Sequence, residues 1–246
     1  MRGASTVTAV SIDGPVIARE DQMTIAAARE LRGATRCFVG IGLPSVAANL
    51  ARATHGSEVV LIYESGTIGA KPTRLPLSIG DGELAETADA VVSVPEIFNY
   101  WLQAGRIDVA FLAGAQIDRQ GNINTTVVGD YDSPVVRLPG AGGAPEIASG
   151  CRRVIVVMRQ SKRSFVDTLD FVTSVGHPER VITDLGVLQP EPSSGELIMT
   201  ALHPGTAVEE AIEATGWPLR LAECLTVTEP PSAAELAALR ALRQAT

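Results

Sequence analysis

A glutamate followed by a small residue and a glycine ends one of the apolar stretches of this sequence. Val59–Tyr63 is largely apolar, and Glu64, Ser65 and Gly66 follow it directly. In open parallel sheets, ligands bind beside the carboxyl ends of the strands, so a carboxylate at this point can meet a ligand with little crowding. Glu64 could therefore act as a nucleophile or a general base. The alternative is a residue that only ends the strand and caps the next turn.

Polar side chains flank a turn signal further along the chain. Asp118 and Gly121 are typical of a tight turn, because aspartate accepts backbone hydrogen bonds and glycine takes a positive φ. Gln116, Asn122 and Asn124 lie on either side of this turn. They could line a binding pocket, or they could satisfy backbone groups in a β-hairpin.

A glycine-rich turn precedes an expected helix around Ile147. It contains Gly140, Gly142 and Gly143. Backbone N–H groups exposed at such a turn can hold a phosphate or a developing oxyanion. The dinucleotide-binding pattern G-x-G-x-x-G is not completed, because residue 145 is proline. The sequence therefore favours an anion or oxyanion site over a dinucleotide site.

The segments that must position these residues alternate between short apolar runs and amphipathic stretches. Apolar runs at successive positions are typical of strands covered on both faces, so we predict an α/β protein with an open, mostly parallel sheet flanked by helices. The strands are expected at residues 37–42 (a strand entering a glycine turn), 58–63, 90–94, 109–114, 153–158, 180–188, 196–202 and 219–227. The helices are expected at 21–31, 44–53 and 95–102, with capping boxes Thr206–Glu209 and Ser232–Glu235 opening two more.

Two glycine-rich segments, 65–88 and 114–150, lack a clear secondary-structure pattern. Long loops in a compact domain are usually functional, so we expect the chemistry to lie in these two segments.

Composition narrows the class of protein. The 246 residues include 20 Lys or Arg and 28 Asp or Glu, a net charge of −8, and 46% are hydrophobic. We predict one domain over residues 1–246, with 1–17 as a loose N-terminal arm. The acidic balance argues against a nucleic-acid partner, and scattered Cys and His residues predict no metal site. No signal peptide or apolar run of about 20 residues is found, so we expect a cytoplasmic protein without a membrane partner.

Six short motifs occur in an order that resembles the β subunit of family I CoA-transferases, closest to the glutaconate and 3-oxoadipate CoA-transferase branch. The motifs are Val39-Gly-Ile-Gly-Leu-Pro44, Tyr63-Glu-Ser-Gly66, Gly114-Ala-Gln-Ile-Asp118, Gly121-Asn-Ile-Asn124, Gly129-Asp-Tyr131 and Gly140-Ala-Gly-Gly-Ala144. Each motif alone is unspecific, whereas six in one order are a strong signal. The resemblance implies a CoA-transferase (NagB-like) fold, a separate α subunit, and an active site between the two subunits.

The resemblance also implies roles for individual residues. Glu64 would be the nucleophile, and the residues that hold the oxyanion and CoA would be Gly140, Gly142, Gly143 and Ala144. From the residues themselves, we predict a substrate pocket that includes Ser65, Gly66, Lys71, Gln116, Asn122 and Asn124. Lys71 and Arg74 could neutralise a substrate carboxylate or a CoA phosphate, or they could be solvated loop cations.

The implied reaction is ping-pong transfer of CoA from an acyl-CoA to a short carboxylic acid, expected to be a dicarboxylic acid, through a glutamyl-CoA thioester. The CoA thioester would be a substrate, and no permanently bound cofactor is expected. The assembly would be an αβ heterodimer, α2β2 or larger. Two alternatives remain: a hydrolase, ring-cleaving enzyme or decarboxylase that acts on a CoA ester, and a non-catalytic ligand-binding module of the same fold.

Overall fold

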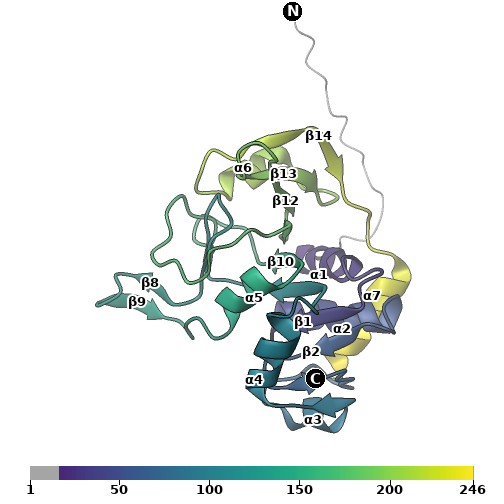
Figure 1. The fold of residues 1–246 in the computed structure, drawn as a ribbon. Helices are drawn as coiled ribbons and strands as arrows, with labels where there is room; N and C mark the ends of the chain where they lie inside the picture. The colour runs from purple at the N-terminus through teal and green to yellow at the C-terminus, as the bar shows by residue number, and fades with distance from the viewer. Residues whose placement is uncertain (1–16, 246) are drawn as a thin grey trace, which may run out of the picture.

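One large sheet forms the centre of the molecule. The computed structural model describes residues 17–245, so the predicted arm at 1–17 lies outside the described residues except for Ile17. The sheet has ten strands in the order β14-β13-β12-β11-β10-β5-β1-β2-β3-β4 (Figure 1). Their bounds are β1 Arg36–Val39, β2 Val60–Ile62, β3 Thr67–Ile68, β4 Ala90–Val91, β5 Val109–Leu112, β10 Arg153–Val157, β11 Arg180–Ile182, β12 Gly186–Pro190, β13 Leu197–Leu202 and β14 Leu221–Val227.

The middle of this sheet is parallel, as predicted. β1 pairs in parallel with β2 and β5, and Cys37 lies opposite both Leu61 and Val109. β5, β10 and β11 continue the parallel pairing, whereas β12 and β3 are each antiparallel to both of their neighbours. The carboxyl ends of β1, β2 and β5 therefore share one edge of the sheet.

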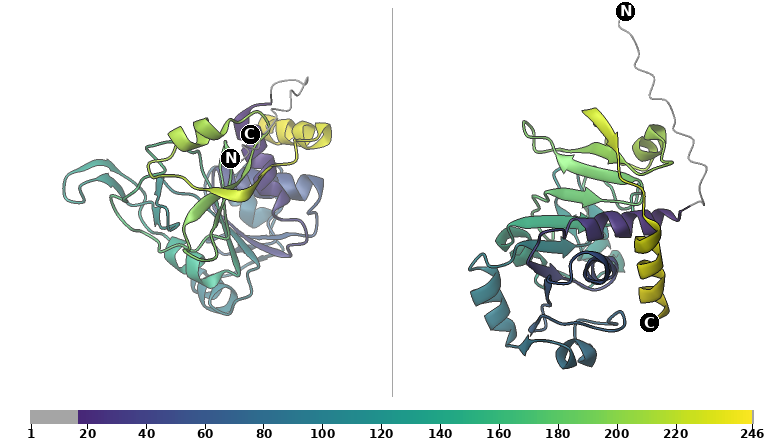
Figure 2. Two further views of the ribbon diagram at one scale, coloured as in Figure 1. Left: turned by 90° about the horizontal axis from the view of Figure 1, so that it is seen from above. Right: turned by 90° about the vertical axis from the view of Figure 1, so that its right-hand side faces the viewer.

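Helices cover both faces of the sheet. Three of them, α1 Arg19–Arg29, α2 Leu43–Thr54 and α7 Ala233–Gln244, pack on one face, where Figure 2 shows them together. The other face is covered by α5 Ala144–Gly150 and the π-helix η1 Ile97–Leu102.

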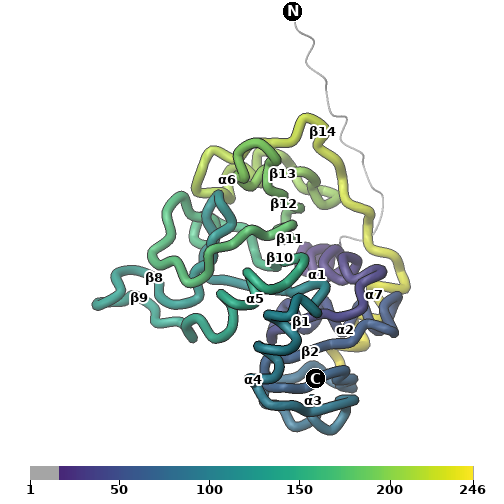
Figure 3. Tube along the Cα trace, in the orientation of Figure 1, coloured from purple at the N-terminus to yellow at the C-terminus, as the bar shows by residue number. Residues whose placement is uncertain are grey.

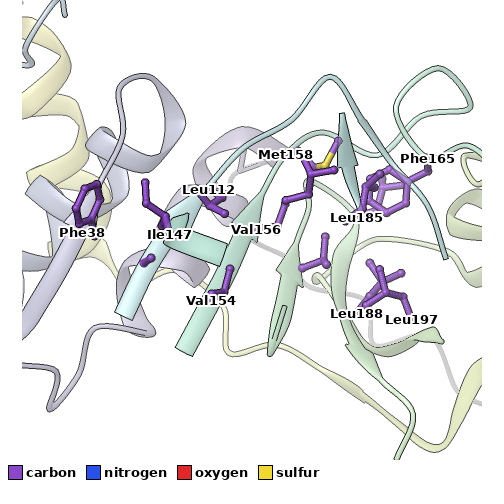
Figure 4. Packing of buried hydrophobic residues seen from close by; sticks show 14 of the residues in the cluster. Phe38, Leu112, Ile147, Val154, Val156, Met158, Phe165, Leu185, Leu188 and Leu197 are labelled. Carbon is purple, nitrogen blue, oxygen red and sulfur yellow. The ribbon is translucent and has the colours of Figure 1, made fainter. Parts of the chain in front are cut away.

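Successive residues of one strand point into different clusters. On β1, Cys37 and Val39 belong to the cluster under α1, α2 and α7, and Phe38 belongs to the opposite one. Figure 4 shows this second cluster running along the sheet from Phe38 to Leu197. The strands are thus buried on both faces, as their continuous apolar runs predicted.

Two predicted loops contain short elements. Segment 65–88 contains β3 and α3 Gly82–Glu86. Segment 114–150 contains two hairpins and α5; the hairpins pair β6 Gln116–Ile117 with β7 Ile123–Asn124, and β8 Val127–Gly129 with β9 Pro134–Arg137. The β6–β7 hairpin agrees with the hairpin interpretation of the turn at Asp118–Gly121, and α5 is the helix expected around Ile147. The β8–β9 hairpin, β3 and α3 were not predicted, because elements of two to five residues are too short to show a period in the sequence.

Other predicted elements changed in detail. The strand expected at 180–188 is split into β11 and β12, because the Thr183 hydroxyl accepts from the backbone N–H of Leu185 (3.1 Å) and Gly186 (3.0 Å) and reverses the chain. The strand expected at 90–94 is only the exposed, two-residue β4, and α4 Val94–Glu96 follows it and leads into η1.

The two predicted capping boxes had different outcomes. At α7, the Ser232 hydroxyl accepts from Glu235 N, and the Glu235 side chain accepts from Ser232 N, as predicted. The prediction of a Thr206–Glu209 box was wrong, since α6 Val208–Glu213 begins after Ala207 without a side-chain cap.

Within residues 17–245, no helix has the length and hydropathy that crossing a membrane requires.

Candidate active site

A tight turn at the end of β2 presents Glu64. Tyr63 N donates to Thr67 O (3.0 Å) and Gly66 N donates to Tyr63 O (3.0 Å), so Glu64 and Ser65 occupy the two corners of the turn. Gly66 has a φ of +107°, and a Cβ there would lie 2.0 Å from the carbonyl oxygen of Val92. Glycine is required at this position for both reasons.

Glu64 lines a small cavity at the carboxyl ends of the parallel strands. The cavity has a volume of about 120 Å³. Its walls come from the ends of β1 and β5, from α5 and from the loop before α5; the lining residues are Phe38, Val39, Gly40, Glu64, Ile79, Phe111, Leu112, Ala141, Gly143, Ala144 and Ile147. This is the edge at which open α/β sheets bind their ligands.

The glycine turn approaches the Glu64 carboxylate closely. A Cβ placed on Gly142 would lie 3.7 Å from Glu64 Oε1, and one placed on Gly143 would lie 3.2 Å from it. The Cβ on Gly143 would also lie 2.5 Å from Phe98 Cζ of η1. Only a residue without a side chain fits between Phe98 and the carboxylate.

The polar groups around this cavity are free for a ligand. Within residues 17–245, the Glu64 carboxylate has no hydrogen bond or ion pair, and the N–H groups of Gly142 and Gly143 donate to no protein acceptor. The Ser65 Oγ atom is buried without a partner in the described part of the chain. Ala144 differs from its neighbours, because its N–H already donates to Ala141 O (3.0 Å).

The predicted polar residues of the hairpin bond to one another. Gln116 and Asn124 are both buried, and Asn124 Nδ2 donates to Gln116 Oε1 (2.7 Å). Gln116 Nε2 donates to Asp170 Oδ2 (2.8 Å), and Asn122 Nδ2 donates to Asp118 Oδ2 (2.8 Å). None of the three lines the Glu64 cavity, so a contact with substrate stays a prediction for them.

The two loop cations after Glu64 are ion-paired. Lys71 pairs with Asp89. Arg74 pairs with Asp81 (2.9 Å) and Glu83 (2.9 Å), and the Arg74 guanidinium lowers the pKa of the Asp81 carboxyl to about 2. The Lys71–Asp89 pair connects the two ends of the segment between β3 and β4, and the Arg74 pairs lie within that segment. A role toward substrate stays a prediction for both cations.

Some residues of the site were not predicted. Phe98 limits the space at Gly143, and Ile79 and Ala141 line the cavity. A π-helix often marks a functional site, but η1 has no sequence signal that separates it from an α-helix. Ala141 lies inside the predicted glycine motif, and that motif is the one sequence signal that could have identified it.

A larger cavity of about 520 Å³ lies between α1 and strands β11–β14 and is lined by none of the predicted site residues.

The family model and the similar proteins of known name all indicate the same family, the coenzyme A transferases. Residues 20–214 match the family model described as Coenzyme A transferase. The chain is 60% identical over 242 residues to the β subunit of the 3-oxoadipate CoA-transferase of Pseudomonas knackmussii, covering 92% of this chain and 93% of that protein. It is 29% identical to the β subunit of the glutaconate CoA-transferase of Acidaminococcus fermentans, covering 87% and 88%.

Solved structures share the fold. The crystal structure of the Acidaminococcus fermentans glutaconate coenzyme A-transferase superposes with a TM-score of 0.83 at 28% identity, covering 91% of this chain and 94% of that one. The decarboxylase AibA/AibB also gives a TM-score of 0.83, at 27% identity, covering 93% and 96%. The same scaffold is therefore found in a transferase and in a decarboxylase.

Proposed function

The chain belongs to the coenzyme A transferase family and is a CoA-transferase β subunit, and we propose that it transfers CoA through a covalent intermediate on Glu64. One observation carries this proposal. The Glu64 carboxylate has no partner among the described residues, and it lines a cavity at the carboxyl ends of the strands close to the backbone of Gly142 and Gly143, whose N–H groups donate to no protein acceptor in that part of the chain.

The proposed reaction is ping-pong. The Glu64 carboxylate attacks the thioester carbonyl of the donor and breaks its C–S bond, which gives an acyl-glutamyl anhydride and CoA thiolate. The thiolate attacks the glutamyl carbonyl, releases the first carboxylic acid as its anion and leaves a glutamyl-CoA thioester. A second carboxylate then runs the same steps in reverse, so that a new acyl-CoA forms and Glu64 is regenerated without net proton transfer or redox change.

Backbone donors would stabilise the charge that develops in these steps. Each tetrahedral intermediate places a negative charge on the former carbonyl oxygen. The N–H groups of Gly142 and Gly143 are the donors proposed for this oxyanion. The loss of one such donor typically costs about 3 kcal/mol in the transition state.

We infer that the acyl groups are short dicarboxylates such as 3-oxoadipate. The support is the 60% identity, over nearly the whole chain, to a protein named as part of a 3-oxoadipate CoA-transferase. The inference concerns the substrate class and is separate from the role of Glu64.

We also propose that an α subunit completes the site, in an αβ, α2β2 or larger assembly. The Glu64 cavity of about 120 Å³ is small beside ligand pockets of roughly 300–1,000 Å³, so a CoA thioester needs further walls. The β8–β9 hairpin projects from the body of the molecule (Figure 3), and it exposes Tyr131, Val135 and Val136. Exposed apolar groups of this kind mark interaction surfaces.

The decisive experiment is detection of the covalent intermediate. The chain is purified together with its α subunit, incubated with an acyl-CoA donor but no acceptor, and analysed by intact and peptide mass spectrometry. We expect a CoA adduct on the peptide that contains Glu64, and we expect Glu64→Ala to abolish it. Glu58→Ala is the matched control, because Glu58 is an exposed glutamate before the opposite end of β2.

Other outcomes would separate the alternatives. Free acid and CoA accumulating without an acceptor would indicate a hydrolase, and release of CO2 would indicate a decarboxylase like the structural relative. No reaction in the presence of the α subunit would favour a binding module.

A further inference from the structure

The glycine loop 140–143 is held by the segment that follows β7. The β8–β9 ladder continues beyond its strands, where Leu138 N donates to Thr126 O (3.0 Å) and Gly140 N donates to Thr125 O (2.9 Å). The loop therefore enters the site as an extension of this hairpin.

The side chain of Thr125 adds a second bond to the same residue. Its Oγ1 donates to Gly140 O (2.8 Å), so Thr125 holds both the N–H and the C=O of Gly140. Gly140 has a φ of +97° and, as glycine, no side chain with which to anchor itself. The peptide planes on both sides of Gly140 thus take their orientation from Thr125.

Thr125 is itself anchored in the protein. Its backbone N–H donates to Thr173 Oγ1 (2.9 Å), and Thr173 Oγ1 also bonds to Thr126 Oγ1 (2.7 Å). On the other side, the buried Asn124 accepts from Thr126 N (2.9 Å) and bonds to Gln116. Asn124 and Gln116 are buried and the three threonines are half-buried, and a hydrogen-bonded network of this kind restricts movement, so it can define the position of the loop.

We propose that Thr125 is a positioning residue for catalysis. Its hydroxyl fixes Gly140 and thereby sets the N–H groups of Gly142 and Gly143 against Glu64, a role that rests on the proposed function. Thr125 does not line the cavity and does not touch the reacting atoms. A misplacement of about 1 Å at reacting groups can cost about a hundredfold in rate, so a single hydrogen bond two residues from the donors can control turnover.

The test compares three variants in the αβ complex. Thr125→Val keeps the shape and removes the hydroxyl, and Thr125→Ser keeps the hydroxyl. Thr200→Val is the matched control, because Thr200 is also half-buried and its Oγ1 also donates to a backbone carbonyl, that of Val187 (3.1 Å), on β13 away from the Glu64 cavity.

A positioning role predicts a specific kinetic pattern. We expect Thr125→Val to lower kcat by about 10- to 100-fold with KM changed less than about threefold, since the loss affects the transition state rather than substrate binding. Thr125→Ser should recover most of the rate, and Thr200→Val should match the unmodified complex. Equal rates for Thr125→Val and the unmodified complex, or no recovery with serine, would overturn the proposal.

A second measurement is independent of activity. Hydrogen exchange of the Gly140 amide, which donates to Thr125 O, should be faster in Thr125→Val than in Thr125→Ser or Thr200→Val, because the second hydrogen bond between Thr125 and Gly140 is lost. An unchanged exchange rate in Thr125→Val would contradict the role of the Thr125 hydroxyl in holding Gly140. If the unmodified complex neither transfers CoA nor forms the Glu64 adduct, the proposed function fails, and exchange at the loop still decides whether Thr125 holds it.

Discussion

Gly143 lies between an aromatic ring and a carboxylate, and a methyl group there would overlap the Phe98 ring and crowd the Glu64 carboxylate. Its φ of −91° suits any residue, so the constraint comes from the surroundings and not from the backbone. The Phe98 ring, 2.5 Å from a Cβ at this position, would have to move, or the loop would move away from Glu64. Either response displaces the proposed oxyanion donors.

At the scale of single residues, we therefore predict that Gly143→Ala reduces kcat by about a hundredfold, the cost typical of a misplacement of about 1 Å. Steady-state kinetics of the αβ complex measure this. Gly82→Ala is the control, because a Cβ at Gly82 has no heavy atom within 4 Å and Gly82 has no positive φ. A Gly143→Ala enzyme with full activity would show that the loop does not need its position against Glu64.

At the scale of elements, α1 and α7 are joined by one largely buried ion pair. Arg29 Nη2 lies 2.7 Å from Glu235 Oε2, with side-chain exposures of 12% and 10%. Arg29 also donates to the carbonyl oxygens of Glu229 and Pro230, the residues that lead into α7. The Arg29 guanidinium is the main cause that lowers the pKa of the Glu235 carboxyl to about 2. The Arg29–Glu235 pair thus stabilises the packing of α7 against α1.

This pair predicts a dependence of stability on pH. Because the folded pKa of Glu235 lies below its ordinary value of 4.5, the unfolded chain binds the proton first as the pH falls. The stabilisation is fully present above pH 4.5 and is lost toward about pH 2. We expect Glu235→Gln to lower the free energy of unfolding by about 2 kcal/mol near neutral pH, the typical worth of a charge-assisted hydrogen bond, and by less near about pH 3.

Urea unfolding at the two pH values measures this difference. Glu213→Gln, at an exposed position on α6, is the control and should change neither value by more than about 0.5 kcal/mol. A Glu235→Gln effect that is the same at both pH values would contradict an ionic origin.

At the scale of the whole molecule, the β8–β9 hairpin, where a partner is proposed, exposes apolar side chains among charged ones. Val135 is 80% exposed on the projecting β8–β9 hairpin, and Arg137 lies over the Tyr131 ring at 4.8 Å from its centroid. The hairpin leads directly into the glycine loop, so a subunit seated on it would also be brought to the Glu64 cavity.

We therefore predict that Val135→Glu weakens assembly with the α subunit by at least about tenfold, because a charge would have to be desolvated at the interface. Size-exclusion chromatography and titration of the two subunits measure this. Val227→Glu is the control, since Val227 is similarly exposed (64%) but belongs to β14, an end strand of the ten-stranded sheet, whereas β8 and β9 form a separate two-stranded sheet. Undisturbed assembly of Val135→Glu would place the α subunit elsewhere.

The elements that the sequence predicted well are those with local signals. The run Val109–Leu112 and the box Ser232–Glu235 both specify their structure through neighbours a few residues away. The β8–β9 hairpin and the split at Thr183 were missed, because short pairings depend on a partner strand rather than on a pattern within one segment.

The sequence by itself determined the family resemblance, the parallel α/β class, and Glu64 at the end of a buried strand. These follow from residue types and spacing, which act over short distances along the chain. Only the tertiary structure decided which segments meet. Packing of both faces of the sheet brings Gly143 and Phe98 to Glu64, and tertiary packing also buries Gln116 and Asn124, which bond to each other. Contact between distant segments depends on how the whole core closes, which no single stretch of residues specifies.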